Sequence, residues 1–335
     1  MPKSKTAIVF LIQVILLLHG ALLIAAPISK DEFSRLRLTD KLLKAQIGEM
    51  ESEFEASPSL DKYRVEYLAT VACKSPSPVS DAQMLQIINK ARFVFLGDEH
   101  TTAESQRNTI NVLNIMKKAA APVTLVLEWI DESHQKDINL YLAGKLPPKD
   151  LRKTIAFDKD WGFSWADYAR ILGAAKKLKV PVLLVERLKK RHNLSERDSY
   201  IAAKIAADAK KKPEMRYLTV YGEYHLLGPG HLTEKCSKLG LKQQLIIVGD
   251  APEVYWKLLA KTMDPDKVMF ARLKENVFFI RNGTPLERSY SYRNYLMKIL
   301  GWKQSDFDER ISAKDIVPVS AAATSNFEAL HNPHK

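Results

Sequence analysis

The sequence predicts an α/β fold in which a mainly parallel sheet lies between two layers of helices. Short apolar runs alternate with helical patterns along most of the chain, and this rhythm is typical of parallel sheets covered by helices. The apolar runs are hydrophobic on consecutive residues, as expected for strands that are buried on both faces. A chain of 335 residues with 46% apolar content can bury one large core. We therefore expect a three-layer α/β/α domain.

The first residues have the layout of an export signal. Lys3 and Lys5 precede an apolar stretch that runs from Ala7 to Ala26 and ends before Pro27. We expect an exported protein that is either periplasmic or anchored in a membrane and facing the periplasm. The same stretch is long enough to span a bilayer, so residues 1–26 are either a signal peptide or an anchor that associates with the membrane through residues 6–26.

Residues 27–78 are predicted to form a helical preface and linker. Leu43, Ile47, Met50 and Phe54 recur at spacings of three and four, which predicts an N-terminal amphipathic helix. The Ser/Pro-rich segment 74–78 then predicts a joint to the main domain. We place that domain at residues 79–303 and expect residues 304–335 to be a loosely structured tail.

Within the domain, the strands and helices are predicted by their periodicity. The expected strands are 92–96, 123–127, 180–185, 217–221, 245–248 and 277–280. The expected helices are 104–118, 166–178, 198–210, 231–239 and 253–261.

The net charge indicates which classes of partner to expect, and the cysteines bear on the redox compartment. The formal net charge is +12, and this excess favours small anionic ligands or membrane surfaces. No nucleic-acid motif accompanies the basic clusters, so we expect no nucleic-acid partner. Cys73 and Cys236 are the two cysteines of the chain; they either pair in an oxidising compartment or remain separate thiols.

Polar residues follow three of the expected strands. These are Gly97-Asp98-Glu99-His100, Glu128-Trp129 and Gly222-Glu223-Tyr224-His225. Ligands of open α/β sheets bind beyond the carboxyl ends of the strands, so we expect these segments to share one site. Thr101 and Glu104 have the spacing of a capping box, which predicts a helix start beside it.

Three kinds of chemistry are compatible with these residues. Carboxylates and histidines can hold Zn²⁺ or Mn²⁺, and the candidate metal ligands are Asp98, Glu99, His100, Glu128, Glu223 and His225. A metal-bound water makes His100, Glu128 and His225 the catalytic candidates of a hydrolase. Imidazole and phenolate groups also ligate haem iron, so His100, Tyr224 and His225 are candidate haem ligands. Structural histidines that terminate strands are the alternative to all three.

Three further groups of residues each have two possible roles. Arg197 and Asp198 either hold an anionic ligand or pair with each other. Trp161, Trp165 and Tyr168 either line an apolar ligand pocket or belong to the core. His231 either joins the site or serves only as a turn-to-helix residue.

Together these motifs resemble the ChaN-like haem-binding uptake family of the Tiki and erythromycin-esterase-related superfamily. The resemblance runs in motif order from about Ala82 to Leu300 and includes Thr284-Pro285 and Ser291-Tyr292. It implies a three-layer domain, located in the periplasm or attached to the envelope, with members proposed to bind haem. Related branches are implied to be metal-dependent hydrolases or proteases that use the two Gly-x-x-His histidines and an acid matching Glu128. The first motif departs from the family in carrying Asp98 where Glu is more frequent.

The sequence therefore supports one leading hypothesis and two alternatives. The leading hypothesis is an envelope protein that binds haem or a related small anionic ligand and acts in haem or iron uptake. The alternatives are a metal-dependent hydrolase or protease and a non-catalytic envelope scaffold. The sequence does not decide whether the protein is an enzyme.

Overall fold

The computed structural model describes residues 27–119, 121–188 and 193–303. The expected signal peptide or anchor at 1–26, with its association region at 6–26, and the expected tail at 304–335 lie outside the described residues. Within the described ranges, none of the helices has the length and apolarity needed to cross a membrane.

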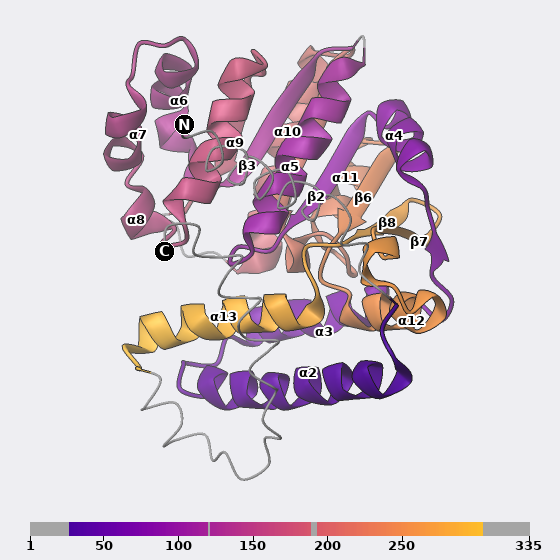
Figure 1. Cartoon of the computed structure of the whole chain (residues 1–335). Helices are drawn as coiled ribbons and strands as arrows, with labels where there is room; N and C mark the ends of the chain where they lie inside the picture. The colour runs from indigo at the N-terminus through magenta and orange to yellow at the C-terminus, as the bar shows by residue number, and fades with distance from the viewer. Residues whose placement is uncertain (1–26, 120, 189–192, 304–335) are drawn as a thin grey trace, which may run out of the picture.

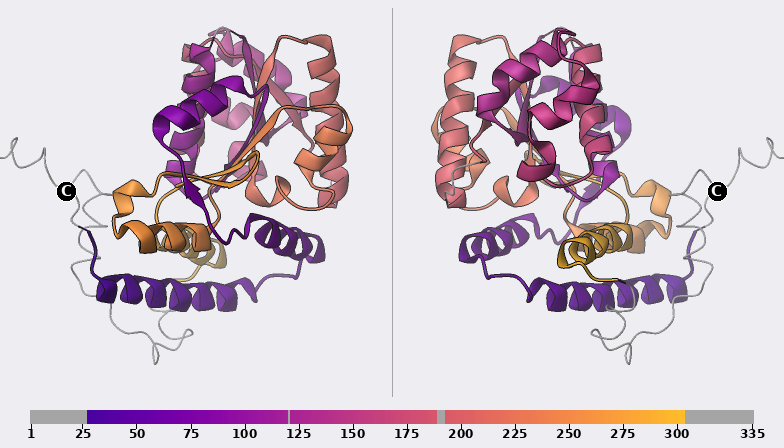
Figure 2. Two further views of the ribbon diagram at one scale, coloured as in Figure 1. Left: turned by 90° about the vertical axis from the view of Figure 1, so that its right-hand side faces the viewer. Right: turned by 90° about the vertical axis from the view of Figure 1, so that its left-hand side faces the viewer.

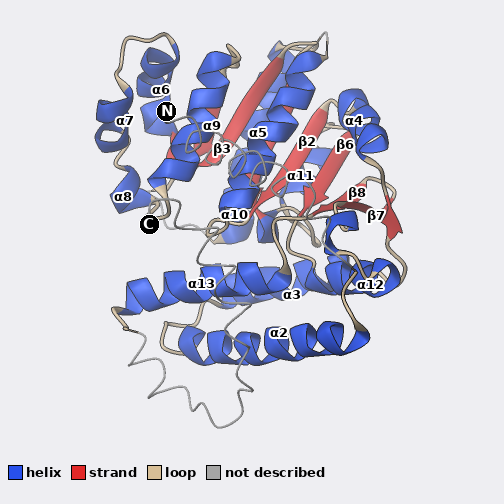
Figure 3. Cartoon of the chain, viewed as in Figure 1, coloured by secondary structure: helices blue, strands red, loops and turns tan. Residues whose placement is uncertain are grey.

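One sheet of eight strands forms the centre of the described structure, in the order β1-β7-β8-β6-β2-β5-β3-β4. The neighbours from β8 to β4 pair in parallel, and β7 pairs antiparallel with β1 and β8. The predicted mainly parallel sheet is confirmed (Figure 3). The strands are β1 (Ser77–Pro78), β2 (Phe93–Asp98), β3 (Val123–Asp131), β4 (Val182–Glu186), β5 (Arg216–Gly222), β6 (Gln244–Val248), β7 (Phe270–Lys274) and β8 (Val277–Ile280).

Helices cover both faces of the sheet, as the views along it show (Figure 2). Successive residues of a strand point to opposite faces: Val94 and Leu96 of β2 join one apolar core, and Phe93 and Phe95 join the other. The first core lies under α4 (Asp81–Lys90), α5 (Ala103–Lys118), α6 (Gln135–Leu142), α7 (Pro148–Thr154), α8 (Phe157–Asp160) and α9 (Trp165–Lys177). The second lies under α10 (Leu194–Lys211), α11 (Leu232–Lys238) and α12 (Pro252–Thr262). The predicted three-layer fold is therefore confirmed.

A further group of helices runs across the carboxyl ends of the parallel strands (Figure 1). It consists of α2 (Lys30–Glu51), α3 (Pro58–Val71) and α13 (Pro285–Leu300). The predicted amphipathic helix is α2, in which Leu43, Ile47 and Met50 are buried against α13, whereas Phe54 lies beyond the helix end and is exposed. These helices close the end of the sheet at which the polar motifs lie.

Several features differ from the sequence prediction. The segment expected as a joint contains β1, which pairs with the unpredicted strand β7. Helix α5 begins at Ala103 with Thr102 as its N-cap residue, so the predicted capping box at Thr101 is wrong. Cys73 and Cys236 are both free thiols, so of the two alternatives, a disulfide or separate thiols, the structure shows separate thiols. Short 3-10 turns follow β3 (Glu132–His134), β5 (Glu223–His225) and α12 (Pro265–Lys267).

Candidate functional site

The end of β2 supplies a histidine that is held by a buried carboxylate. His100 Nδ1 lies 3.0 Å from Asp98 Oδ2. The same carboxylate accepts hydrogen bonds from Tyr168 Oη at 2.6 Å, Gln106 Nε2 at 2.7 Å and Ser105 Oγ at 3.1 Å. Burial opposes ionisation of Asp98, but these donors outweigh it and hold its pKa below the ordinary value. The Asp98 carboxylate therefore fixes the orientation of the His100 ring and leaves Nε2 available.

The end of β5 supplies a second histidine with the same support. His225 Nδ1 lies 2.6 Å from Asp198 Oδ1, and Tyr63 donates its hydroxyl to Asp198 Oδ2 at 3.1 Å. Burial disfavours the imidazolium of His225, but the charge and hydrogen bond of Asp198 outweigh it and raise its pKa. The pKa of His100 is raised in the same way by Asp98. Each histidine is thus the end of a Tyr–Asp–His relay.

Both histidines converge on Glu128, which follows the apolar part of β3. Glu128 Oε1 lies 3.8 Å from His225 Nε2 and 3.3 Å from Arg197 Nη2. Its other oxygen accepts the backbone N–H of Gly222 at 2.5 Å. Burial opposes ionisation of Glu128, but the charges of both histidines and Arg197 outweigh it and lower its pKa. The result is a buried carboxylate between two imidazoles.

Gly222 permits this close approach. A Cβ atom at this position would lie 3.2 Å from His100 Nε2 and 3.3 Å from Glu128 Oε2. Those contacts are tighter than ordinary van der Waals packing. A side chain at this position would therefore require His100 or Glu128 to shift by a few tenths of an ångström, whereas the φ of −48° is itself open to any residue.

The two remaining acids of the motifs belong to a separate cluster. Glu223 accepts hydrogen bonds from Tyr67 Oη at 2.5 Å and from the Gly249 backbone at 2.6 Å. Glu99 forms an ion pair with Arg288 of α13 at 2.6 Å. Burial raises the pKa of each of these two carboxyl groups to about 7. Their partners come from α3, α13 and the end of β6, so this cluster ties the covering helices to the sheet.

The predicted site residues therefore fall into two groups. Asp98, His100, Glu128, Arg197 and His225 come together, while Glu99, Glu223 and Tyr224 lie in the second cluster. Tyr224 packs against Tyr67 with ring centroids 5.3 Å apart, and burial raises its pKa well above the ordinary value. Across the described ranges, no three or more His, Cys, Asp or Glu side chains are grouped so that they could hold a metal ion.

Arg197 and Asp198 do not pair with each other, and each contacts other residues of the site. Arg197 pairs with Glu186 at 2.8 Å as well as with Glu128, and Asp198 is bound to His225 and Tyr63. Arg197 and Asp198, which are consecutive residues of α10, thus contact Glu128 and His225, respectively. His231 is fully buried and lies 2.9 Å from Glu66 of α3.

Aromatic rings pack beside His100. The ring centroid of His100 lies 4.7 Å from that of Trp161 and 5.0 Å from that of Phe163. Phe163 stacks in turn on Tyr295 of α13 at 4.6 Å. The His100 side chain is 26% exposed, compared with 8% for His225. His100 is therefore the more accessible imidazole, and it is set in an aromatic wall.

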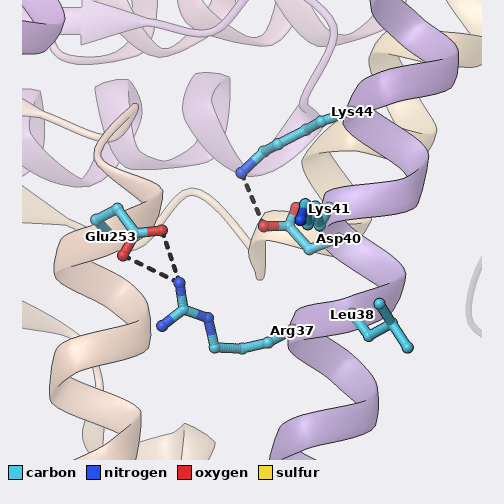
Figure 4. Close-up of a pocket in the computed structure, with 6 residues that line it drawn as sticks. All are labelled: Arg37, Leu38, Asp40, Lys41, Lys44 and Glu253. Carbon is cyan, nitrogen blue, oxygen red and sulfur yellow. Dashed lines mark hydrogen bonds and ion pairs between the residues drawn. The ribbon is translucent and has the colours of Figure 1, made fainter.

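A surface hollow between α2 and α12 is a different feature (Figure 4). Its ion pairs join Arg37 to Glu253 at 2.9 Å and Lys44 to Asp40 at 2.7 Å. No histidine is among the residues that line it, which are Arg37, Leu38, Asp40, Lys41, Lys44 and Glu253. It is separate from the histidine site.

Comparison with known families agrees with the resemblance seen in the motifs. Residues 84–187 match the family described as haem-binding uptake, Tiki superfamily, ChaN. These residues are ChaN-like. The ChaN-like segment contains the first motif, Glu128, the Trp161–Tyr168 segment and Glu186, whereas Asp198 and His225 lie beyond it. No curated protein matches the chain.

Solved structures with similar arrangements include ChaN of Campylobacter jejuni, which is described with cofacially bound haem. That structure is 13% identical, with a TM-score of 0.42 over 61% of this chain and 92% of its own. The type III effector HopBA1 is 13% identical, with a TM-score of 0.41 over 54% of this chain and 87% of its own. The C-terminal region of Pasteurella multocida toxin, described with a thiol-protease-like triad, is 14% identical, with a TM-score of 0.38 over 63% of this chain and 30% of its own.

Sequence reasoning missed two tyrosines, Tyr63 and Tyr67, and one acid, Glu186. Tyr63 lies 135 residues from Asp198 along the chain, and Glu186 ends β4 without any accompanying motif. Tyr67 belongs to a helix that carries no recognisable site motif. Inspection of the residue directly after every predicted strand would have identified Glu186. No local signal in the sequence indicates Tyr63 or Tyr67.

Proposed function

We propose that this protein binds haem through His100. The observation that carries the proposal is the hydrogen bond that holds the His100 ring. Nδ1 is held by Asp98, which leaves Nε2 as the nitrogen for a ligand, as in carboxylate-supported histidines at metal centres. The family match over residues 84–187 supports the same conclusion.

The surroundings of His100 fit a large planar ligand. Trp161 and Phe163 offer ring faces and edges close to the imidazole, and rings of this kind pack against a macrocycle. Bound haem would supply iron for axial ligation and a strong optical spectrum. Arg197 pairs with Glu128 and Glu186, so we do not assign it to the propionates.

Titration with haemin tests this proposal. We expect the purified protein to give a saturable shift of the Soret band, and we expect His100→Ala to abolish it. His134→Ala is the matched control, since His134 also has its Nδ1 held by an aspartate, Asp137, at 2.9 Å but lies outside the site. A titration curve for His100→Ala that overlays that of His134→Ala would refute axial ligation by His100.

A second candidate function rests on a different observation, the convergence of two relays on Glu128. Two supported imidazoles around a carboxylate form an arrangement for general acid–base hydrolysis, in which one ring accepts a proton from water and the other protonates the leaving group. A metal-dependent version, with Zn²⁺ or Mn²⁺ on His100, His225 and Glu128, would require these side chains to rearrange, since they are not grouped to hold a metal ion in this structure.

Metal analysis and hydrolytic assays distinguish this candidate from haem binding. A hydrolase or protease predicts turnover on ester or peptide panels that Glu128→Gln and His225→Gln abolish, and a metal-dependent one predicts loss on chelation. Haem ligation by His100 alone predicts that His225→Gln retains the Soret shift. A protein that fails all these measurements would be the scaffold alternative.

We also propose that the protein acts outside the cytoplasm, in the envelope, and contributes there to haem or iron uptake. The basic start and apolar stretch of residues 1–26 support export. Cell fractionation with an antibody against the domain tests the location, and the mass of the purified mature chain distinguishes a cleaved signal from an anchor. Recovery in the cytoplasmic fraction would contradict the proposal.

A further inference from the structure

We propose that Tyr63 of α3 is a positioning residue for His225, acting through Asp198, and that the N-terminal helix α3 is thereby a working part of the site. This inference rests on the second candidate function above, in which both histidines act around Glu128. The segment matched by the family, residues 84–187, does not contain α3, Asp198 or His225. The role of α3 therefore follows from the contacts of this chain.

The first step is the geometry at Asp198. Its side chain is fully buried, so bulk water does not reach the carboxylate. One oxygen lies 2.6 Å from His225 Nδ1, and the other accepts the hydroxyl of Tyr63 at 3.1 Å. With one oxygen held by the phenol, the carboxylate is turned so that the other oxygen faces the imidazole. Tyr63 therefore sets the orientation of Asp198, and Asp198 sets that of His225.

The second step compares this relay with the one at His100. Asp98 is held by Tyr168 and also by Ser105 and Gln106 of the adjoining α5. Asp198 has no such additional support: among the described residues, Tyr63 is the one side chain besides His225 that is hydrogen-bonded to it. Loss of the tyrosine hydroxyl should therefore affect the His225 relay more than the His100 relay.

The third step is the rigidity of α3 at this point. Tyr63, Glu66 and Tyr67 fall at i, i+3 and i+4 on one face of the helix. Glu66 binds His231 at 2.9 Å, and Tyr67 binds Glu223 at 2.5 Å. The ring of Tyr63 also stacks on His231, with centroids 3.8 Å apart and an interplanar angle of 11°. These three contacts with Glu223 and His231, in the segment between β5 and α11, fix α3. The Tyr63 hydroxyl is therefore held at Asp198.

The tautomer of His225 in the ligand-free protein tests the inference. Long-range ¹H–¹⁵N NMR correlations from the carbon-bound ring protons report which nitrogen is protonated at alkaline pH, where the ring is neutral. In the wild type we expect the proton on Nδ1 of both rings, and His225→Gln and His100→Gln assign the signals. In Tyr63→Phe we expect the His225 signals to move toward a mixture of tautomers, while the His100 signals stay in place.

Tyr67→Phe is the matched control, because it removes a buried hydroxyl from the same face of the same helix. Its hydroxyl donates to Glu223 and not to Asp198, so the tautomer of His225 should stay on Nδ1. Circular dichroism and thermal midpoints establish that both variants fold. If Tyr63→Phe and Tyr67→Phe give the same His225 signals, Tyr63 is only a packing residue and the inference is wrong. Since this measurement needs no haemin, failure of the inference and failure of haem binding are separate results.

Discussion

Substitution of Asp98 by Asn gives a prediction whose size follows from the structure. The Asp98 carboxylate accepts four hydrogen bonds, two on each oxygen. Asparagine has one acceptor oxygen, which can keep the bonds from Ser105 and Gln106, whereas its NH2 group must donate to Tyr168 Oη and His100 Nδ1 and so reverses those two bonds. A charged acceptor contributes about 1.5–3 kcal/mol per hydrogen bond and a neutral bond about 0.5–1.5 kcal/mol, so replacing four charged bonds with four neutral ones loses about 4 kcal/mol together. Easier burial of the neutral amide offsets part of this loss. We expect Asp98→Asn to lower the free energy of unfolding by about 2–3 kcal/mol, measured by urea denaturation.

A second His–Asp pair provides the control for this prediction. Asp137 lies 2.9 Å from His134 Nδ1, and its side chain is 30% exposed, compared with 2% for Asp98. Because solvent screens the exposed pair, Asp137→Asn should cost less than about 1 kcal/mol. Equal losses in the two variants, at unchanged urea m-values, would refute the argument that burial and the four donors give Asp98 its importance.

Three further predictions follow from contacts of this structure. Gly222→Ala should retain the fold and weaken haemin binding at least tenfold by titration, since its methyl group would lie 3.2 Å from His100 Nε2; wild-type affinity would contradict the crowding argument. Arg216→Ala should cost about 3 kcal/mol in urea denaturation, because the buried guanidinium donates to three backbone carbonyls, those of Ala91, Met116 and Ile88; a loss below 1 kcal/mol would contradict it. Stability should fall as pH rises from about 4.5 to about 7, since the raised pKa of Glu223 means that the folded state binds the proton more tightly than the unfolded state. Glu223→Gln should remove its part of that slope in urea titrations across this range, and an unchanged slope would refute the assignment.

The fold could be predicted from the sequence to the extent that local patterns determine it. Strands such as β2 and β5 are apolar on consecutive residues, and this pattern identifies buried parallel strands without any knowledge of their neighbours. β1 and β7 escaped prediction for a physical reason. Only two residues of β1 pair, and β7, which lies between β1 and β8, alternates between buried and exposed positions over five residues, so neither has the run of consecutive apolar residues that marks the buried parallel strands.

The site was predictable in its ligand-type residues and not in its supports. Residues at strand ends meet because parallel strands share one edge, and in the structure His100, Glu128 and His225 lie together. Glu99 and Glu223 lie in a separate cluster, since adjacent residues of a turn point in different directions. Tyr63 was out of reach, because its contact with Asp198 is set by how α3 docks on the completed sheet.

The unequal exposure of the two histidines bears on which function the site can serve. Axial ligation brings the nitrogen at the edge of an imidazole ring to the face of the haem, so the ligating histidine must be accessible to a large planar ligand. The side chain of His100, which lies beside Trp161 and Phe163, is 26% exposed. His225 at 8% exposure, beneath Tyr63 of α3, is reachable by a ligand the size of water. Haem binding therefore requires one relay of the pair, whereas hydrolysis requires both. Acid–base chemistry accounts for the hydrogen bonds that hold His225, whereas haem ligation by His100 alone leaves His225 without a role.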